Sequence, residues 1–259
     1  MDNIKDALEI LNKDRIRNIN LINFIKEYRI DVIYIEGASV LVKGKSDQAW
    51  TYISSESEAE MNALLKYLNE KDQHFAIIED WMLPLIVKDR RLEWILSCVK
   101  LYFPDQAVLP ENRVAVFELS TTDAQYIFEN SKYQQYTSRE YIIERIQKGI
   151  GLGIYKNKKL VAWILTHDDG AMGFLHVLPE YRGKGYAYEV TIAAIKRLRA
   201  REEIPFVHIE EDNQRSMNLS LKMGFVKDRL IHWIKIKQDR EDRGRSDCPH
   251  AGNDFLALI

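Results

Sequence analysis

The chain has 259 residues, of which 46% are hydrophobic, so it can bury a sizeable core in one large domain or two smaller ones. Its 37 basic and 39 acidic residues leave a formal net charge of −2, which argues against nucleic acid or an anionic membrane as the main partner. The two cysteines, Cys98 and Cys248, lie far apart and outside any cysteine or histidine cluster. Neither a disulfide framework nor a metal site is therefore indicated.

No apolar run approaches the roughly 18 residues that a membrane span needs. The charged first residues also differ from the basic and then apolar pattern of a signal peptide. We therefore expect a soluble protein of the cytoplasm.

The first half of the chain predicts an α/β domain. Apolar residues recur at helical spacing between Ile4 and Tyr28, which predicts one or two helices. Three runs rich in Val, Ile and Tyr then predict an antiparallel meander: residues 31–36, 39–43 and 49–54. After these we expect a helix over 56–71 capped by Ser55, a strand over 74–78, and beyond Pro84 a helix carrying Leu92, Ile95, Leu96 and Val99.

Residues 103–110 have the composition of a connector, and we place a domain boundary there. The expected domains are an N-terminal α/β domain over 1–105, a second domain over 111–238, and a flexible tail over 239–259. We expect the tail to be flexible because it contains a dense run of mixed charges and lacks periodic apolar residues.

The second domain begins with a predicted strand over 114–118 and two helices, one capped near Ser120 and one running from Ser138 to Lys148. Three antiparallel strands are expected next, over 149–156, 159–167 and 171–177. After a glycine loop come a long helix to about Arg201, a strand over 207–210, a helix over 214–223 and a strand over 226–236.

The loop between the third strand and the long helix has the chemistry of a phosphate site. Gly183 and Gly185 would let a ligand approach the unpaired amides of the first helical turn, and Arg182 and Lys184 add positive charge beside them. A pyrophosphate would fit. The sequence matches neither the P-loop nor the dinucleotide fingerprint, which need other glycine and lysine spacings.

Arg182-x-x-Gly185-x-Ala187 after a strand resembles the coenzyme A pyrophosphate loop of the GNAT (GCN5-related N-acetyltransferase) superfamily. A second similar block runs from Asn213-x-x-Ser216 to Gly224-Phe225, in the family's order and at its spacing. The resemblance covers roughly residues 114–236, and Leu178 to Gly183 is most similar to the glycine N-acyltransferase branch. It implies a mixed, mostly antiparallel sheet flanked by helices. The first half repeats the order of elements without the loop, so it could be a degenerate copy.

The resemblance implies that an acyl-CoA, most simply acetyl-CoA, is the co-substrate and that no metal is needed. In the family, the backbone of the strand entering the loop binds the thioester carbonyl and the pantetheine, and the loop and the second block complete the site. The residues at these positions are His176, Val177, Leu178, Arg182, Gly183, Lys184, Gly185, Tyr186, Ala187, Asn213 and Ser216. Acceptor-binding residues would lie near the second helix, where Tyr133, Tyr136 and Tyr141 occur, although packing alone also explains these rings.

Two departures from the family concern catalysis. The tyrosine that commonly protonates the leaving thiolate is replaced by Ser220, a much weaker acid, and the position of the usual carboxylate base is Ala171. His176 and Glu210 are our candidates for the base, and His208, Asp168 and Asp169 lie nearby. A lone histidine on a core strand is more often structural than catalytic.

We therefore expect an N-acyltransferase that moves an acyl group directly from acyl-CoA to a primary amine of a small molecule or amino acid. The alternative is a non-catalytic acyl-CoA-binding sensor or interaction module that has lost the usual acid and base. Acyl-CoA and the amine are the expected partners, and a homodimer is left open by the sequence.

Overall fold

The computed structural model describes residues 2–88, 90–131, 134 and 137–237. Its described residues form two compact units: residues up to Cys98 together with residues 229–237, and residues 99–228. The tail expected over 239–259 lies outside the described residues. The expected domains over 1–105 and 111–238 cut the chain elsewhere, and whether those segments fold independently stays a prediction.

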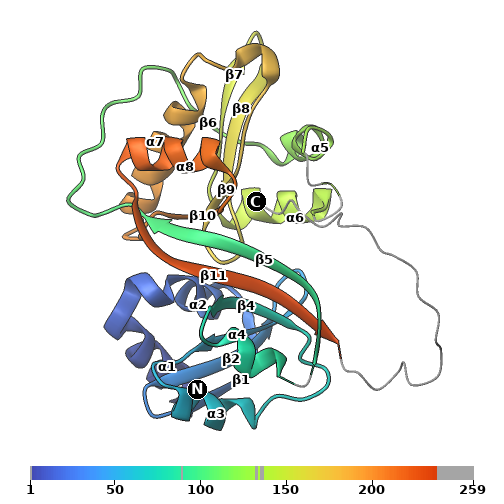
Figure 1. Ribbon diagram of the computed structural model, residues 1–259. Helices are drawn as coiled ribbons and strands as arrows, with labels where there is room; N and C mark the ends of the chain where they lie inside the picture. Colours follow the sequence, from blue (N-terminus) through green and yellow to red (C-terminus); the bar gives the residue numbers. More distant parts are fainter. Residues whose placement is uncertain (1, 89, 132–133, 135–136, 238–259) are drawn as a thin grey trace, which may run out of the picture. The chain divides into compact units, whose positions relative to one another are not determined.

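The first unit is a sheet with helices on both faces (Figure 1). Its elements are α1 (Asp2–Leu11), α2 (Arg15–Glu27), β1 (Arg29–Glu36), β2 (Ser39–Lys45), β3 (Ala49–Ser54), α3 (Glu58–Leu65), β4 (His74–Glu79), α4 (Leu83–Val87) and the first part of β5 (Arg91–Tyr102). The expected N-terminal helices and the antiparallel meander β1-β2-β3 are confirmed. One core packs α1 and α2 on the sheet, and a second packs α3 and α4 against it.

The helix expected around Leu92 to Val99 is wrong, because this segment belongs to strand β5. The burial of its side chains alternates, with Leu92, Trp94, Leu96 and Cys98 turned inward and Ile95 exposed. Apolar residues here fit both a helical and a two-residue period. The two-residue period prevails because the segment pairs into a sheet, where alternate side chains point to opposite faces.

Two further elements are shorter than expected. Helix α3 covers Glu58–Leu65 and not 56–71, because Ser57 and not Ser55 caps it, its side chain accepting from the N–H of Glu60 at 3.2 Å. The strand expected over 114–118 is reduced to β6 (Phe117–Glu118). Ahead of it, the chain is held by the buried carboxylate of Glu189, which accepts from the N–H of Arg113 at 2.9 Å and from Asn112 at 3.0 Å.

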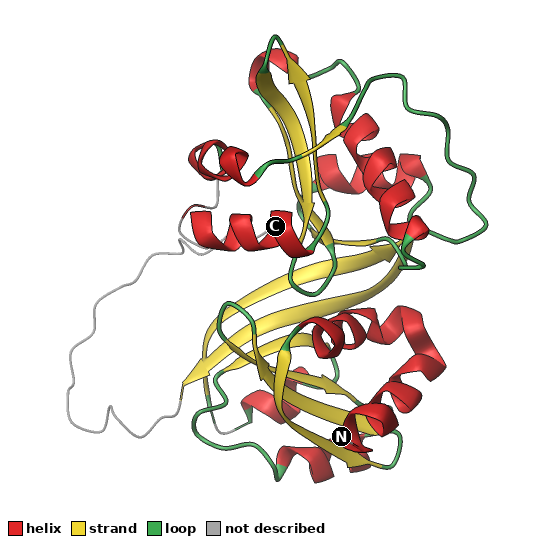
Figure 2. Cartoon of the chain, turned by 180° about the vertical axis from the view of Figure 1, so that it is seen from behind, coloured by secondary structure: helices red, strands yellow, loops and turns green. Residues whose placement is uncertain are grey.

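The second unit carries a four-stranded antiparallel sheet in the order β6-β7-β8-β9, covered by α5 and α6 on one side and by α7 on the other (Figures 1 and 2). Its remaining elements are α5 (Ala124–Glu129), α6 (Arg139–Lys148), β7 (Gly151–Lys156), β8 (Lys159–Thr166), β9 (Met172–Val177), α7 (Tyr186–Ala200), β10 (Phe206–Glu210), α8 (Gln214–Met223) and the first residues of β11 (Val226–Lys237), most of which belongs to the first unit. Ser138 caps α6 as expected, and α8 has its expected bounds. The predicted fold class, a mixed and mostly antiparallel sheet flanked by helices, is confirmed.

The two units differ in whether two equivalent strands pair with each other. Both have two helices, three antiparallel strands, a helix and a further strand, in that order. In the first unit the strands on either side of α3 hydrogen-bond in parallel, with Thr51 opposite Phe75 and Tyr52 opposite Ala76. In the second unit β9 ends its sheet and β10 belongs to the other sheet, although the two strands approach each other. We call the place where β9 and β10 lie next to each other in different sheets the split.

Strands β5 and β11 are neighbours in the larger sheet and run through both units, because residues 99–102 and 226–228 belong to the second unit and the rest to the first. Strand β5 thus begins in the first unit and ends in the second, whereas β11 begins in the second unit and ends in the first. Lys100, fully buried, pairs with Asp228 at 3.1 Å. Farther along, Ser97 hydrogen-bonds to His232 at 2.8 Å and Glu93 pairs with Lys235 at 3.0 Å.

We expect Asp228→Asn to lower the free energy of unfolding by about 3 kcal/mol, because it removes the carboxylate that neutralises a fully buried ammonium group. The control is Glu93→Gln, whose partners Lys235 and Lys237 are partly exposed to solvent, with an expected cost of about 1 kcal/mol or less. Urea denaturation of both variants measures the difference. Equal costs would mean that burial of Lys100 does not depend on Asp228.

Candidate functional site

The glycine loop leaves β9 at Val177 and enters α7 at Tyr186. Pro179–Tyr181 form one 3-10 turn, after which Gly183 and Gly185 have φ values of +76° and +79°. These left-handed angles suit glycine, and a Cβ atom at either position would meet nothing within 4 Å. The two glycines therefore face open space at the start of a 15-residue helix.

The open space in front of these glycines is bordered by donors and positive charge. The first amides of α7 have no partner within the helix, and the helix dipole adds partial positive charge there. Arg182 is anchored beside the strand end, since its Nε donates to the carbonyl of Val177 at 3.1 Å. The ammonium of Lys184 lies 4.9 Å from the centre of the Tyr181 ring. Arg182, Gly183, Lys184, Gly185, Tyr186 and Ala187 thus form one continuous surface suited to an anion.

Strand β9 is bulged at Phe174, which has a φ of +54°. The register with β8 shifts between the pairs Trp163–His176 and Leu165–Gly173, so β9 has one extra residue there. A bulge leaves a residue outside the ladder and turns the strand locally. It occurs on the strand that borders the split.

The side chain of His176 stacks on Trp163, with ring centres 4.5 Å apart and planes inclined by 17°. This packing explains why a histidine occurs at that position of the strand. The neighbouring Val177 and Leu178 are buried, and the amide of Leu178 already donates to the carbonyl of Val161 at 3.0 Å. Of the three positions expected to bind the ligand through their backbone, Leu178 thus already uses its N–H in a hydrogen bond to β8.

Strand β10 carries His208 and Glu210, two residues apart and therefore on the same face. His208 is buried, and its Nδ1 lies 3.9 Å from a carboxylate oxygen of Asp169. Burial lowers the pKa of His208 to about 4, Asp169 opposes this shift, and the charges of Lys100 and His167 add to it. His208 is therefore neutral at pH 7.

Burial raises the pKa of Glu210 above its ordinary value, and the charge of Asp212 raises it further. A carboxylate with a raised pKa accepts a proton more readily at neutral pH than an exposed one does. Glu210 therefore has the properties of a proton acceptor at the edge of the split. The sequence offered Glu210 and His208 as separate candidates, and the approach of His208 to Asp169 is a tertiary contact that no local pattern signals.

Ala171, at the position of the usual base, is buried and its backbone is engaged. Its N–H donates to Asp169 at 2.9 Å, and its carbonyl accepts from the N–H of His167 at 2.8 Å. A methyl side chain in this position offers no proton acceptor. The hairpin nevertheless places the carboxylate of Asp169 two residues away.

The second block supplies structure at the start of α8. Asn213 caps this helix, its side-chain oxygen accepting from the N–H of Ser216 at 3.1 Å. Ser220 is buried in the same helix, and its carbonyl accepts from the N–H of Phe225 at 3.0 Å. The Asn-x-x-Ser spacing is thus explained by helix capping as well as by the expected ligand contact.

On the side of α6, Tyr141 hydrogen-bonds to the carboxylate of Asp168 at 3.3 Å, and its ring contacts Phe174 at a centroid distance of 6.1 Å. The other two tyrosines expected near the acceptor, Tyr133 and Tyr136, lie outside the described residues.

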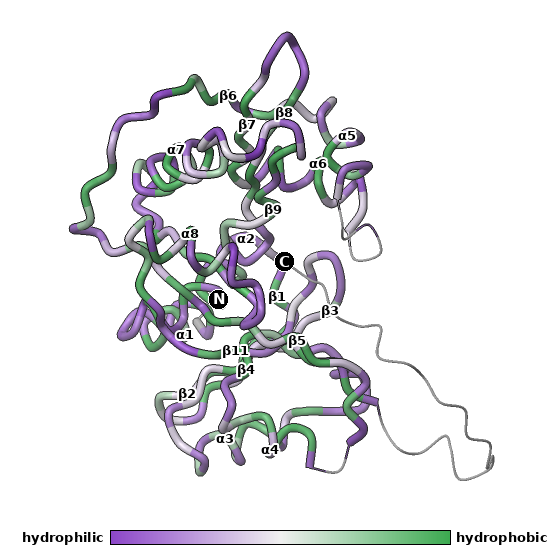
Figure 3. The backbone as a smooth tube through the Cα atoms, turned by 45° about the horizontal axis from the view of Figure 1, so that its top comes forward, coloured by the Kyte–Doolittle hydropathy of each residue, from purple (hydrophilic) through white to green (hydrophobic). Residues whose placement is uncertain are grey.

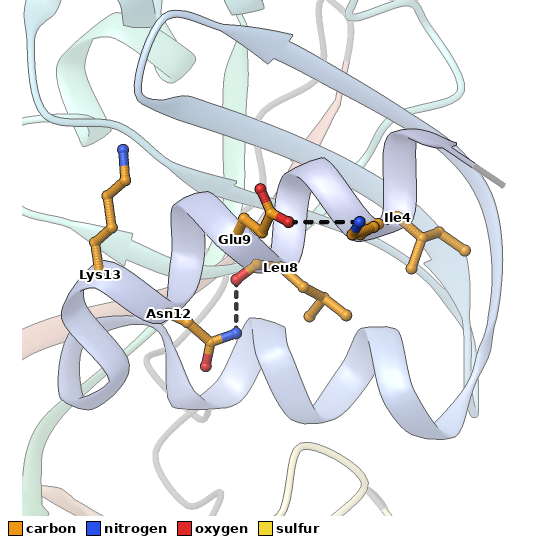
Figure 4. A pocket seen from close by; sticks show the side chains of 6 residues that line it. Ile4, Leu8, Glu9, Asn12 and Lys13 are labelled. Carbon is orange, nitrogen blue, oxygen red and sulfur yellow. Dashed lines mark hydrogen bonds and ion pairs between the residues drawn. The ribbon is translucent and has the colours of Figure 1, made fainter.

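A hollow in the first unit, drawn in Figure 4, follows α1 and is lined by Ile4, Leu8, Asn12 and Lys13 together with a Lys5–Glu9 pair at 3.9 Å. Among residues that the structure describes, no group of three or more histidine, cysteine or acidic side chains could hold a metal ion. Within the same described ranges, every helix is too short or too polar to cross a bilayer.

Residues 151–234, from β7 into β11, match the family model of FR47-like proteins. Among solved structures, a Drosophila protein is similar over 91% of this chain and 96% of its own, with a TM-score of 0.74 and 17% identity. A GCN5-related N-acetyltransferase from Kribbella flavida matches over 85% and 94%, with a TM-score of 0.54 and 12% identity. The chain has the GNAT fold.

A tandem GNAT protein from the clavulanic acid biosynthesis pathway is also similar, over 91% of this chain and 95% of its own, with a TM-score of 0.53 and 12% identity. No curated protein matches the sequence. The predicted GNAT resemblance is confirmed, whereas the closer assignment to the glycine N-acyltransferase branch stays a prediction.

The buried neutral His208 of this GNAT fold predicts a stability change with pH. The unfolded chain binds a proton near pH 6.5, whereas the folded protein resists protonation down to about pH 4. The free energy of unfolding should therefore fall as pH drops between 6.5 and 4, by on the order of 3 kcal/mol from this residue. Acid titration of urea midpoints tests this, with His208→Asn expected to show a shallower decline. Parallel curves for the two proteins would contradict a buried neutral histidine.

Proposed function

We propose that the chain is an acyl-CoA-dependent N-acyltransferase, most simply using acetyl-CoA, that acylates a primary amine of a small molecule or amino acid. The observation that carries this proposal is the open glycine loop at the start of α7, next to the split between β9 and β10. Acetyltransferases among the proteins of similar fold support the reaction class.

The described residues fit an acyl-CoA. A pyrophosphate would bind the amides of Gly183 to Ala187, with Arg182 and Lys184 supplying charge. The pantetheine and the thioester carbonyl would lie along β9 at His176 and Val177, because β9 is the last strand of its sheet and leads into the loop. Asn213 and Ser216 would contribute from the start of α8.

The proposed chemistry is direct transfer. The amine nitrogen attacks the thioester carbonyl carbon, a C–N bond forms, and the C–S bond breaks to release the thiolate of coenzyme A. Glu210 takes the proton that the nitrogen loses, since its raised pKa suits a general base. Its stacked ring makes His176 the weaker candidate for this step. Ser220 would donate a hydrogen bond and not a proton, because a hydroxyl is a poor acid.

One site per chain is expected, because the first unit lacks the features of this site. Its strands β3 and β4 are hydrogen-bonded where the split would be. The first turn of α3 carries Glu58 and Glu60, which repel an anion, and the side chain of Ser57 occupies one of its amides. The proposal that this unit is a degenerate copy is supported by its order of elements.

Gly185→Glu should abolish binding of acetyl-CoA, because a side chain and a negative charge would enter the space in front of the loop. Titration calorimetry should find one molecule of acetyl-CoA per wild-type chain and none for the variant. The control is Gly224→Ala, which also places a side chain at a positive φ but lies at the end of α8. Unchanged affinity in Gly185→Glu would refute the loop assignment.

Glu210→Gln should lower turnover by about 10²-fold to 10⁴-fold and leave acetyl-CoA affinity within twofold. Because a raised pKa means that the base ionises above its ordinary range, the wild-type rate should rise with pH through that pKa, and the variant should lose this dependence. Release of free thiol with a panel of amines measures the rate, and Glu211→Gln, an exposed neighbour, is the control.

Equal rates for Glu210→Gln and wild type would remove Glu210 from the reaction. Tight binding of acetyl-CoA without turnover on any amine would favour the non-catalytic acyl-CoA-binding module.

A further inference from the structure

A second group of cations lies beside the glycine loop, on the hairpin that joins β7 and β8. Three of the four residues in this turn are lysines, Lys156, Lys158 and Lys159, and its tip is hydrophilic (Figure 3). Asn157 and Lys158 both have positive φ, at +50° and +66°, which makes the turn a tight one. The hairpin thus holds several ammonium groups close together.

Two tyrosine rings connect this hairpin with the loop. The Nζ of Lys156 lies 5.7 Å from the centre of the Tyr186 ring, and the Nζ of Lys184 lies 4.9 Å from the centre of the Tyr181 ring. The two rings lie 6.4 Å apart with planes inclined by 27°. Two ammonium groups from different segments are therefore held on one aromatic pair at the start of α7.

These two ammonium groups are available to an anion. Lys159 is paired with Glu180 at 3.1 Å, whereas no ion pair between described residues involves Lys156 or Lys184. A ring face attracts a cation without neutralising it, and an ammonium has three N–H donors. Lys156 and Lys184 thus retain charge and donors for a ligand.

We propose that Lys156 binds the phosphate monoester on the ribose 3′ oxygen of coenzyme A, while Lys184 supplies charge to the neighbouring pyrophosphate. The inference rests on the proposed acyl-CoA function and names a further contact of that same ligand. Coenzyme A carries this monoester in addition to its pyrophosphate. The loop amides serve the pyrophosphate, and the hairpin lysine supplies the charge that the dianionic monoester requires. The β7–β8 hairpin then recognises the 3′-phosphate of the ligand.

The test compares coenzyme A with 3′-dephospho-coenzyme A by calorimetry. Wild type should bind coenzyme A about tenfold more tightly than the dephospho compound, because one charge-assisted contact is lost. Lys156→Gln should reduce this preference to about twofold and leave the affinity for 3′-dephospho-coenzyme A unchanged. The matched control is Lys196→Gln on the same helix as Tyr186, about 15 Å along its axis and paired with Glu111. Melting temperatures of both variants should stay at the wild-type value.

Each other outcome overturns the inference. Equal wild-type affinities for the two compounds would leave the proposed function standing and remove the 3′-phosphate contact. A parallel loss for both compounds in Lys156→Gln would place this lysine on another part of the ligand. Absence of binding by wild type to either compound would overturn the proposed function together with the inference.

Discussion

The candidate site depends on two neighbouring strands that belong to different sheets. Strand β9 is the last of the four-stranded sheet, and β10 is the last of the seven-stranded sheet. Around this split the chain places the bulge at Phe174, the glycine loop and Glu210. In the first unit the corresponding strands, β3 and β4, are hydrogen-bonded in parallel. The difference between the two units therefore lies in strand pairing more than in the order of elements.

Local patterns predicted much of this architecture. The start of a helix at Ser138 was recognisable from the sequence, because capping depends on residues three positions apart. The segment from Arg91 to Tyr102 was predicted wrongly because its apolar residues suit two periods, and only its neighbours in the sheet decide between them. The strand expected before Glu118 was predicted too long. The backbone ahead of it is bound to the buried carboxylate of Glu189, a tertiary contact that the local sequence does not indicate.

The site was predictable in part. Glycines at 183 and 185 indicate a close approach of backbone to a ligand, and the structure gives both of them positive φ and open space. The environment of His176 was not predictable, because its stacking on Trp163 depends on the register of β8 with β9. The burial of His208 next to Asp169 likewise depends on where a hairpin meets a strand from another sheet.

The crossing of β5 and β11 through both units has a consequence for synthesis of the chain. Strand β4 pairs with β11, so Glu79 must wait for Ile231, about 150 residues later, before its ladder is complete. While the ribosome makes the second half, the edge of β4 stays open in a nascent chain that already has buried apolar faces. The first half of the chain is thus synthesised first but cannot complete its sheet first. Edge-to-edge aggregation threatens this protein most while only the first half has been made.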